Sequence, residues 1–310
     1  MSSLITESYV QQFGANIFHL SQQKGSKLRE TVRQETQKGE SAFYDRIGTV
    51  AAIKKVGRHS TTPQLDTPHS RRMVTLVDYE WADLIDDADK IRSLNDPTND
   101  YVMAAMWAMG RSIDDEIILA LGGNAYSGQK GTVAVALPNA QMYSANNGAA
   151  FTDLNVKTLR ALKRIFDNND VEDNDRYIAC APSQIESLLG QVEVTSSDYN
   201  SVKALVQGDV NSFMGFTFKR LTRLPTVASG SGIVASPTTG IVGAGSSVDG
   251  FRQAYAYCKM GVLLAVGADI TSRVSERDDK SYSTQAYAKM TIGATRMEEA
   301  KVIQVFCKEG

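Results

Sequence analysis

The stretch GGNAYSGQKGT (residues 122–132) comes closest to a site of known chemistry, because two of its glycines have the spacing of a P-loop. A P-loop cradles phosphates with backbone N–H groups and needs a lysine directly after its second glycine. Here Gln129 follows Gly128. The stretch also follows a helical pattern, whereas a P-loop follows a strand. We interpret these residues as a structural glycine turn.

A second glycine-rich motif and an acidic cluster also lack the spacing that binding needs. GAGSSV, which begins at Gly243, has no third glycine of the dinucleotide-binding fingerprint. The acidic cluster between Asp167 and Asp175 fits no EF-hand loop, because an acidic residue stands where that loop requires glycine. We interpret this cluster as a solvated helix end.

Histidines and paired carboxylates give no catalytic or metal site either. His19, His59 and His69 have neither the HExxH pattern nor another paired spacing of zinc ligands. Asp114 and Asp115 are adjacent on an expected helix and point in different directions, a poor geometry for sharing a proton. No GxSxG nucleophile motif occurs. We therefore expect no enzyme activity, no metal and no cofactor.

The composition is that of a soluble globular protein. The 310 residues (33.7 kDa) are 42% hydrophobic and 22% charged, which excludes a disordered or fibrous chain. A net charge of −2 argues against a dedicated nucleic-acid or membrane-surface binder. Three widely spaced cysteines without a CxxC pair indicate reduced thiols. Residues 1–12 show no signal peptide, and the longest apolar run, residues 262–266, is too short to span a bilayer.

The first third of the chain predicts an arm followed by an extended hairpin. Residues 1–42 are polar and irregular, as in an arm with little core of its own. A strand-like pattern then runs from Phe43 to Val56 and resumes from Val74 to Trp81. Residues 58–72 between them contain one apolar side chain, Leu65. Compact domains seldom keep so long a polar tip unless something uses it.

The strongest helix signal covers residues 97–122. Asp96 suits the N-cap and Pro97 the first helical position, and apolar residues then recur every three or four positions until two glycines end the pattern. A second amphipathic helix is expected from Asp153 and a short one over 182–189. Strands are expected at 177–180, around 216–218, over 288–294 and at 302–307, and a surface loop over 229–250. The fold class is therefore α+β.

Charge is distributed unevenly along the chain. Residues 1–75 hold 11 Lys or Arg and 6 Asp or Glu, a net charge of +5; residues 76–125 hold 3 and 11, a net charge of −8; the remainder is +1. A projecting basic hairpin cannot easily fold back onto its own acidic root, which favours pairing between subunits over solvated faces without a partner. The candidate inter-subunit contacts are Lys54, Lys55, Arg58, Arg71, Arg72, Asp83, Asp86, Asp87, Asp89, Asp114, Asp115 and Glu116. We expect reversal of Arg71 and Arg72 to block assembly in a folded subunit.

Several stretches, taken in order, resemble the tailed-phage major capsid proteins. The N-terminal arm is matched by QQKGSKLRETV (22–32), and the extended loop and its return by GESAFYDRIG (39–48) and DTPHSRRMVTLVDYEWADLIDDADKIR (66–92). The spine helix is matched by WAMGRSIDDEIILAL (107–121), and a glycine-centred strand by FMGFTFKRLTRLP (213–225). The closing segment is matched by VGADITSRVSERDDKSYSTQAYAKMTIGATRMEEAKV (266–302).

The resemblance implies a structural coat protein with five parts. These are an N-terminal arm (1–42), an extended loop or hairpin (43–82), a peripheral domain with the spine helix 97–122 (83–172), an axial domain (173–261) and closing peripheral strands (262–310). In that family the extended loop lies over a neighbour's peripheral domain. Pentamers and hexamers form an icosahedral shell around double-stranded DNA, in a virion assembled in the host cytoplasm.

The resemblance also bears on partners and cross-linking. It implies a portal and, because only about 42 residues precede the loop, a separate scaffolding protein; a decoration protein is a further candidate partner. Some members join subunits by a Lys–Asn isopeptide, but the last asparagine here is Asn211, so we expect none. Two alternatives stay open at this stage: an encapsulin-like compartment shell around a cargo enzyme, and an enzyme with an unrecognised site. No membrane partner is expected.

Overall fold

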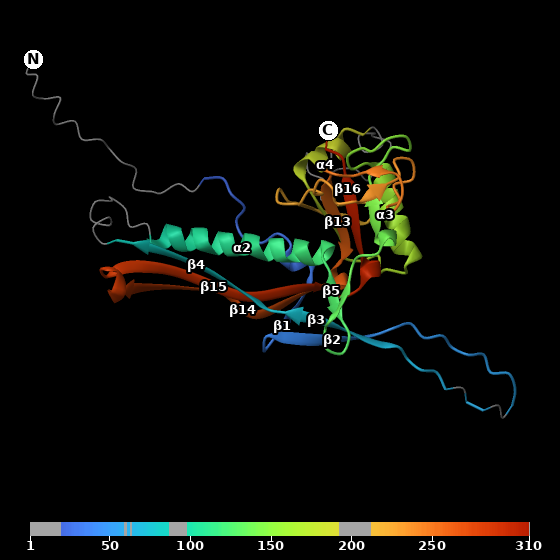
Figure 1. Cartoon of the computed structure of the whole chain (residues 1–310), viewed down its shortest axis with the longest axis horizontal. Helices are drawn as coiled ribbons and strands as arrows, with labels where there is room; N and C mark the ends of the chain where they lie inside the picture. The colour runs from blue at the N-terminus through green and yellow to red at the C-terminus, as the bar shows by residue number, and fades with distance from the viewer. Residues whose placement is uncertain (1–19, 59–60, 63, 87–97, 192–211, 310) are drawn as a thin grey trace, which may run out of the picture. The chain divides into compact units, whose positions relative to one another are not determined.

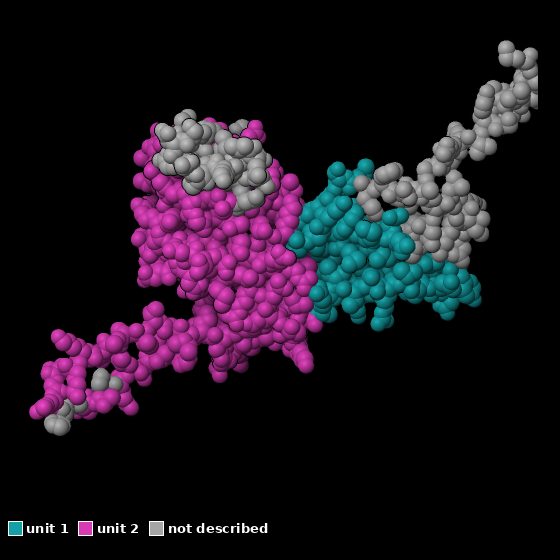
Figure 2. Space-filling model, turned by 180° about the vertical axis from the view of Figure 1, so that it is seen from behind, with its two compact units in different colours: residues 1–26, 78–112, 268–291 teal, residues 27–77, 113–267, 292–310 magenta. Residues whose placement is uncertain are grey.

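The computed structural model describes residues 20–58, 61–62, 64–86, 98–191 and 212–309. The chain divides into two compact units (Figure 2). Unit 1 comprises residues 1–26, 78–112 and 268–291, and unit 2 comprises residues 27–77, 113–267 and 292–310. Helices and sheets are mixed along the chain, which confirms the α+β class.

The largest sheet belongs to unit 2 and has the strand order β7-β16-β13-β8-β10-β9. Its strands are β7 (Met142–Ser144), β16 (Val302–Cys307), β13 (Arg252–Cys258), β8 (Arg176–Cys180), β10 (Phe216–Arg220) and β9 (Ser212–Phe213). β13 is antiparallel to both β16 and β8, whereas β8 and β10 are parallel. The strands expected at 177–180, 216–218 and 302–307 are confirmed.

Two helices, α3 (Val156–Asn168) and α4 (Pro182–Leu189), pack against this sheet (Figure 1). Leu159, Leu162 and Phe166 of α3 are fully buried in the same core as the apolar residues of β8 and β13. α3 begins three residues later than the sequence predicts, because Asn155 is the N-cap and its side chain accepts a hydrogen bond from the Thr158 backbone N–H. The short helix over 182–189 is confirmed.

A four-stranded sheet, also in unit 2, holds the hairpin. Its order is β2-β3-β5-β6, with β2 (Ser41–Ile47), β3 (His69–Thr75), β5 (Ala125–Ser127) and β6 (Val133–Val135). β2 and β3 are antiparallel, with Ser41 opposite Thr75 and Ile47 opposite His69. The prediction of a strand as far as Val56 is wrong. The last ladder bond runs from the Gly48 N–H to the Pro68 carbonyl, and Pro68 has no N–H to continue it.

The third sheet has the order β1-β14-β15-β4 and runs through residues of both units. Its strands are β1 (Arg33–Thr36), β14 (Val262–Arg277), β15 (Ser283–Arg296) and β4 (Val77–Ile85). The long helix α2 (Thr98–Gly122) confirms the expected spine helix over its described part, and its 25 residues span about 37 Å. Asp96 and Pro97 lie outside the described residues.

Two segments that the sequence presents as irregular contribute to the core. In the N-terminal arm, Leu28 and Val32 are fully buried, and the Thr31 hydroxyl lies 2.5 Å from the Tyr257 hydroxyl. The loop over 229–250 contains the strand pair β11 (Val234–Ala235) and β12 (Ser246–Ser247) and a small apolar cluster around Val242. Short 3-10 helices occur at Arg29–Thr31, Asn139–Gln141, Lys259–Gly261, Asp278–Lys280 and Glu299–Lys301.

Candidate assembly interface

The motifs with potential chemistry have structural roles in the fold. Gly122 ends α2 and Gly123 follows it; β5 then takes up residues 125–127 of the P-loop-like stretch, and β6 begins directly after the stretch. Gly128 and Gly131 lie between these two strands with φ of 93° and 67°, a backbone conformation that favours glycine. The order of helix followed by strand is the reverse of a P-loop, which confirms the interpretation as a glycine turn.

The described part of the chain gives neither a metal centre nor a membrane span. No group of three or more His, Cys, Asp or Glu residues within it is placed to hold a metal ion. No helix in that part is long and apolar enough to cross a membrane. The three cysteines are free and buried, and burial raises the pKa of Cys180 to about 12, which keeps it as an unreactive thiol at neutral pH.

Arg71 and Arg72 point to opposite faces of β3, because successive side chains alternate in a strand. The Arg71 side chain is 42% exposed and forms an ion pair of 3.3 Å with Asp45. Arg72 is 1% exposed and pairs with Glu299 in the same unit. The expectation that reversal of both arginines leaves the subunit folded is therefore wrong for Arg72, whose reversal would place a carboxylate beside Glu299.

Glu299 is the centre of a buried network of three guanidinium groups. All three form ion pairs with it: Arg72, which is buried, Arg296, which is buried with its Nε at 3.8 Å, and Arg46, which is 25% exposed with its Nη1 at 3.7 Å. Burial lowers the pKa of Arg72 and of Arg296, and Glu299 opposes this effect by favouring their charged forms. The guanidinium of Arg296 also donates to three backbone carbonyls at the end of α2 and on β6, those of Leu121, Gly123 and Val135.

The two adjacent carboxylates on α2 have different partners, as their different directions predict. Asp114 is fully buried and accepts hydrogen bonds from the backbone N–H groups of Lys27 and Leu28, at 3.0–3.1 Å. Asp115 is half-exposed and pairs with Arg223, whose Nε lies 2.9 Å from it. Asp114 thus holds the arm of its own subunit. Asp114 and Arg72 are therefore removed from the candidate inter-subunit contacts, because both are buried and paired within their own subunit.

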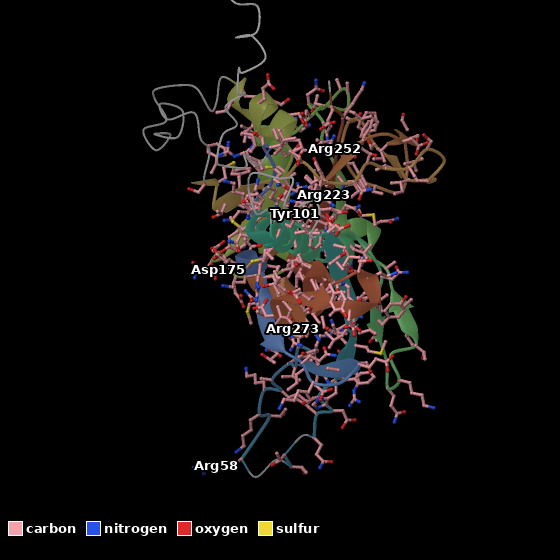
Figure 3. The ribbon with its side chains drawn as sticks, turned by 90° about the vertical axis from the view of Figure 1, so that its left-hand side faces the viewer. Arg58, Tyr101, Asp175, Arg223, Arg252 and Arg273 are labelled. Atoms are coloured by element: carbon pink, nitrogen blue, oxygen red, sulfur yellow. The ribbon has the colours of Figure 1, made fainter. Side chains whose placement is uncertain are left out.

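Three further cations of the set lie on the segment between β2 and β3, which projects from the body of unit 2 (Figures 1 and 2). Lys54, Lys55 and Arg58 are all exposed, and Figure 3 shows Arg58 near the end of the projection. In unit 1, Asp83 and Asp86 are exposed. Glu116 is half-buried, and Asp87 and Asp89 lie outside the described residues.

Apolar side chains on the same projection are also exposed. Val56 is 96% exposed and Val50 60%, with Ile53 and Leu65 above one half; Ile47, the last residue of β2 at the base of the projection, is 70% exposed. A concentration of exposed aliphatic residues on one segment marks an interaction surface. Cations interspersed with these residues give the projection the mixed polar and apolar character of a protein–protein interface.

Arg296 and Glu299 are not among the contact residues that the sequence predicts. Alternation along β15 places Met290 and Ile292 on the buried face, and a continued count of every second residue puts Arg296 on that face too. That signal was available for Arg296. Nothing local marks Glu299, which lies 227 residues from Arg72.

Comparison with known proteins identifies relatives by family and by fold. The family model described as "Phage capsid protein" matches residues 5–309. Among solved structures, the capsid of cyanophage P-SCSP1u aligns with a TM-score of 0.74 at 14% identity, over 99% of this chain and 95% of that chain. The head of Helicobacter pylori bacteriophage KHP40 aligns with a TM-score of 0.73 at 11% identity, over 100% and 99%. No curated protein matches the chain.

Proposed function

The chain belongs to the phage capsid protein family, and from this premise we propose that its copies assemble as pentamers and hexamers into the icosahedral shell of a tailed phage. It is a structural major capsid protein, and its place is the capsid of the virion. The family does not favour the enzyme or the cargo compartment. The shell encloses double-stranded DNA without reading its sequence and assembles in the host cytoplasm.

The observation that best supports this assembly is the exposed projection between β2 and β3. Its aliphatic residues are exposed to water in the single subunit, and burying them would contribute about 0.8 kcal/mol of free energy for each CH₂ group. A neighbouring copy that covered Val50, Ile53 and Val56 would supply that burial, and its acidic residues would pair with Lys54, Lys55 and Arg58. The candidate acidic partners are Asp83 and Asp86, with Asp87 and Asp89 beyond the described residues.

The five-part division of the chain remains part of this proposal. Its proposed parts are the arm (1–42), the loop (43–82), the peripheral parts (83–172 and 262–310) and the axial domain (173–261), and the loop would lie over the peripheral domain of a neighbouring copy. A separate scaffolding protein, a portal and a decoration protein are the proposed further partners. The shell is held together without covalent cross-links.

Electron microscopy of the purified chain tests the proposal. We expect ring-shaped capsomers or closed shells from the wild-type chain, and a loss of shells from the variant Lys54→Glu/Lys55→Glu. The matched control Lys130→Glu/Lys289→Glu makes the same change of charge at exposed positions outside the projection and should still form shells. A wild-type chain that stays monomeric at every concentration would overturn the proposal.

A further inference from the structure

Helix α3 carries a row of cations on the side that faces away from the core of unit 2. Leu159, Leu162 and Phe166 are buried, whereas Arg160 and Arg164 are exposed on the opposite side. We define the basic face as Lys157, Arg160, Lys163 and Arg164. Three of its members have the spacing i, i+3 and i+7, which places them along one side of a helix.

The basic face has no carboxylate partner within the described part of the chain. None of its four cations forms an ion pair there, and Lys157 Nζ donates a hydrogen bond to the amide oxygen of Asn146 at 2.9 Å. Four cations on little more than two helical turns repel one another. An anionic partner outside the subunit would relieve that repulsion.

Two hollows adjoin the basic face, and Lys157 and Arg160 line both. The first, of about 520 Å³, also contains Asp153 and Ser187. The second, of about 500 Å³, is completed by Arg164 and by Ile241, which is 62% exposed. Exposed isoleucine next to arginine is typical of a protein interface, whereas phosphate contacts on DNA need no apolar side chain.

A complementary surface begins at the other end of the same helix. We define the acidic turn as Asp167, Asp170, Glu172, Asp173 and Asp175. All five are exposed, and Figure 3 labels Asp175. Within the described residues, Arg176 and Lys301 form ion pairs with these carboxylates, so the turn keeps an excess of negative charge there. Asp170 and Asp175 adopt φ of 52° and 56°, a left-handed conformation that aspartate tolerates better than most residues.

We infer that the basic face of α3 in one copy contacts the acidic turn of the next copy around a capsomer ring. Closed rings with rotational symmetry need two different surfaces on each subunit, one for each neighbour. The face and the turn are two such surfaces, of opposite charge and in one unit. The partner is therefore a second copy of this chain, and the inference rests on the proposed shell function.

Paired charge changes test this contact. The face variant is Arg160→Glu/Arg164→Glu, at two exposed positions that form no ion pair within the described part of the chain. The turn variant is Glu172→Lys/Asn174→Lys, which spares the residues of positive φ and the carboxylates that pair with the buried Arg176. Each variant alone should lower the yield of rings about tenfold or more, measured by sedimentation velocity and electron microscopy.

Two combinations give results that a structural role alone would not produce. The chain with all four changes should recover part of the ring formation, because the two glutamates introduced on the face can pair with the two lysines introduced on the turn of the next copy. An equimolar mixture of the face variant and the turn variant should form rings with even numbers of subunits, because complementary contacts require the two chains to alternate. Five-membered rings should be absent from that mixture.

Thermal unfolding of each variant and the control Lys130→Glu/Lys289→Glu separate assembly from folding. We expect unfolding temperatures close to that of the wild type and normal rings from the control. If the face variant forms rings at the wild-type yield, the inference is overturned while the shell function stands. The inference is also overturned if the face variant forms normal shells that contain less DNA, because the basic face would then bind nucleic acid and not a second copy. A wild-type chain that forms no rings overturns both.

Discussion

Guanidinium groups serve opposite purposes in two regions of unit 2. At the base of the hairpin, Arg72 and Arg296 are buried and share one carboxylate, Glu299. On α3, Arg160 and Arg164 are exposed and no ion pair is formed within the described residues. A buried charge needs its partner for the subunit to fold, whereas an exposed charge can be used by another copy. Burial, and not the number of charges, therefore distinguishes folding residues from assembly residues.

The largest effect is expected at the centre of the buried network. Glu299→Gln leaves Arg72 and Arg296 without the carboxylate that compensates their charge, and should lower the free energy of unfolding by about 3–5 kcal/mol. Asp45→Asn, at the exposed pair with Arg71, is the matched control and should cost about 0–1 kcal/mol. Urea denaturation of unassembled subunits measures both values. Equal losses of stability in the two variants would show that burial does not separate the charges needed for folding from the exposed ones.

A smaller effect is expected where a buried carboxylate holds the arm. Asp114→Asn replaces one accepting oxygen by an NH₂ group that faces backbone N–H donors, and should cost about 1–3 kcal/mol. Hydrogen exchange of the Lys27 and Leu28 amides should accelerate. Asp115→Asn removes the half-exposed ion pair with Arg223 and should leave the Lys27 and Leu28 amides protected from exchange. Unchanged exchange in Asp114→Asn would show that the carboxylate does not hold the arm.

An intermediate case comes from Asp153, in the first hollow beside α3. Burial raises the pKa of this carboxyl, although hydrogen bonds from the Leu154 N–H and Ser187 oppose the shift. A carboxyl whose pKa is higher in the folded state stabilises the fold at low pH, and this contribution is lost as pH rises through the folded pKa. The stability of Asp153→Asn relative to wild type should therefore increase from pH 3 to pH 7. Thermal unfolding across that range measures it, and a relative stability that falls would contradict the burial argument.

The smallest effect is expected on the basic face. Arg160→Gln/Arg164→Gln should change the free energy of unfolding of the subunit by no more than about 0.5 kcal/mol, because both side chains are exposed. The same variant should still reduce ring formation. A loss of stability comparable to that of Glu299→Gln would show that these arginines belong to the fold.

Local patterns predicted the elements, and distant contacts decided the roles of the charges. α2, α4 and β8 follow from apolar spacing and end signals within each segment. The net charge of a segment does not distinguish Arg71 from Arg72, because it takes no account of the two faces of a strand. Burial of the arm around Leu28 depends on Asp114, which is 86 residues away, and no pattern inside the arm indicates it.

Electron cryomicroscopy of shells assembled from the wild-type chain would show the neighbours of each charged side chain, and so would show whether buried charges pair within one subunit and exposed charges pair between copies. Arg72 should keep Glu299, and Asp114 the Lys27 and Leu28 amides, within one subunit. Arg58 on the projection and Arg160 on α3 should each lie beside a carboxylate of another copy. Shells in which Arg58 and Arg160 face solvent in every copy would contradict the assignment of these two arginines to contacts between copies.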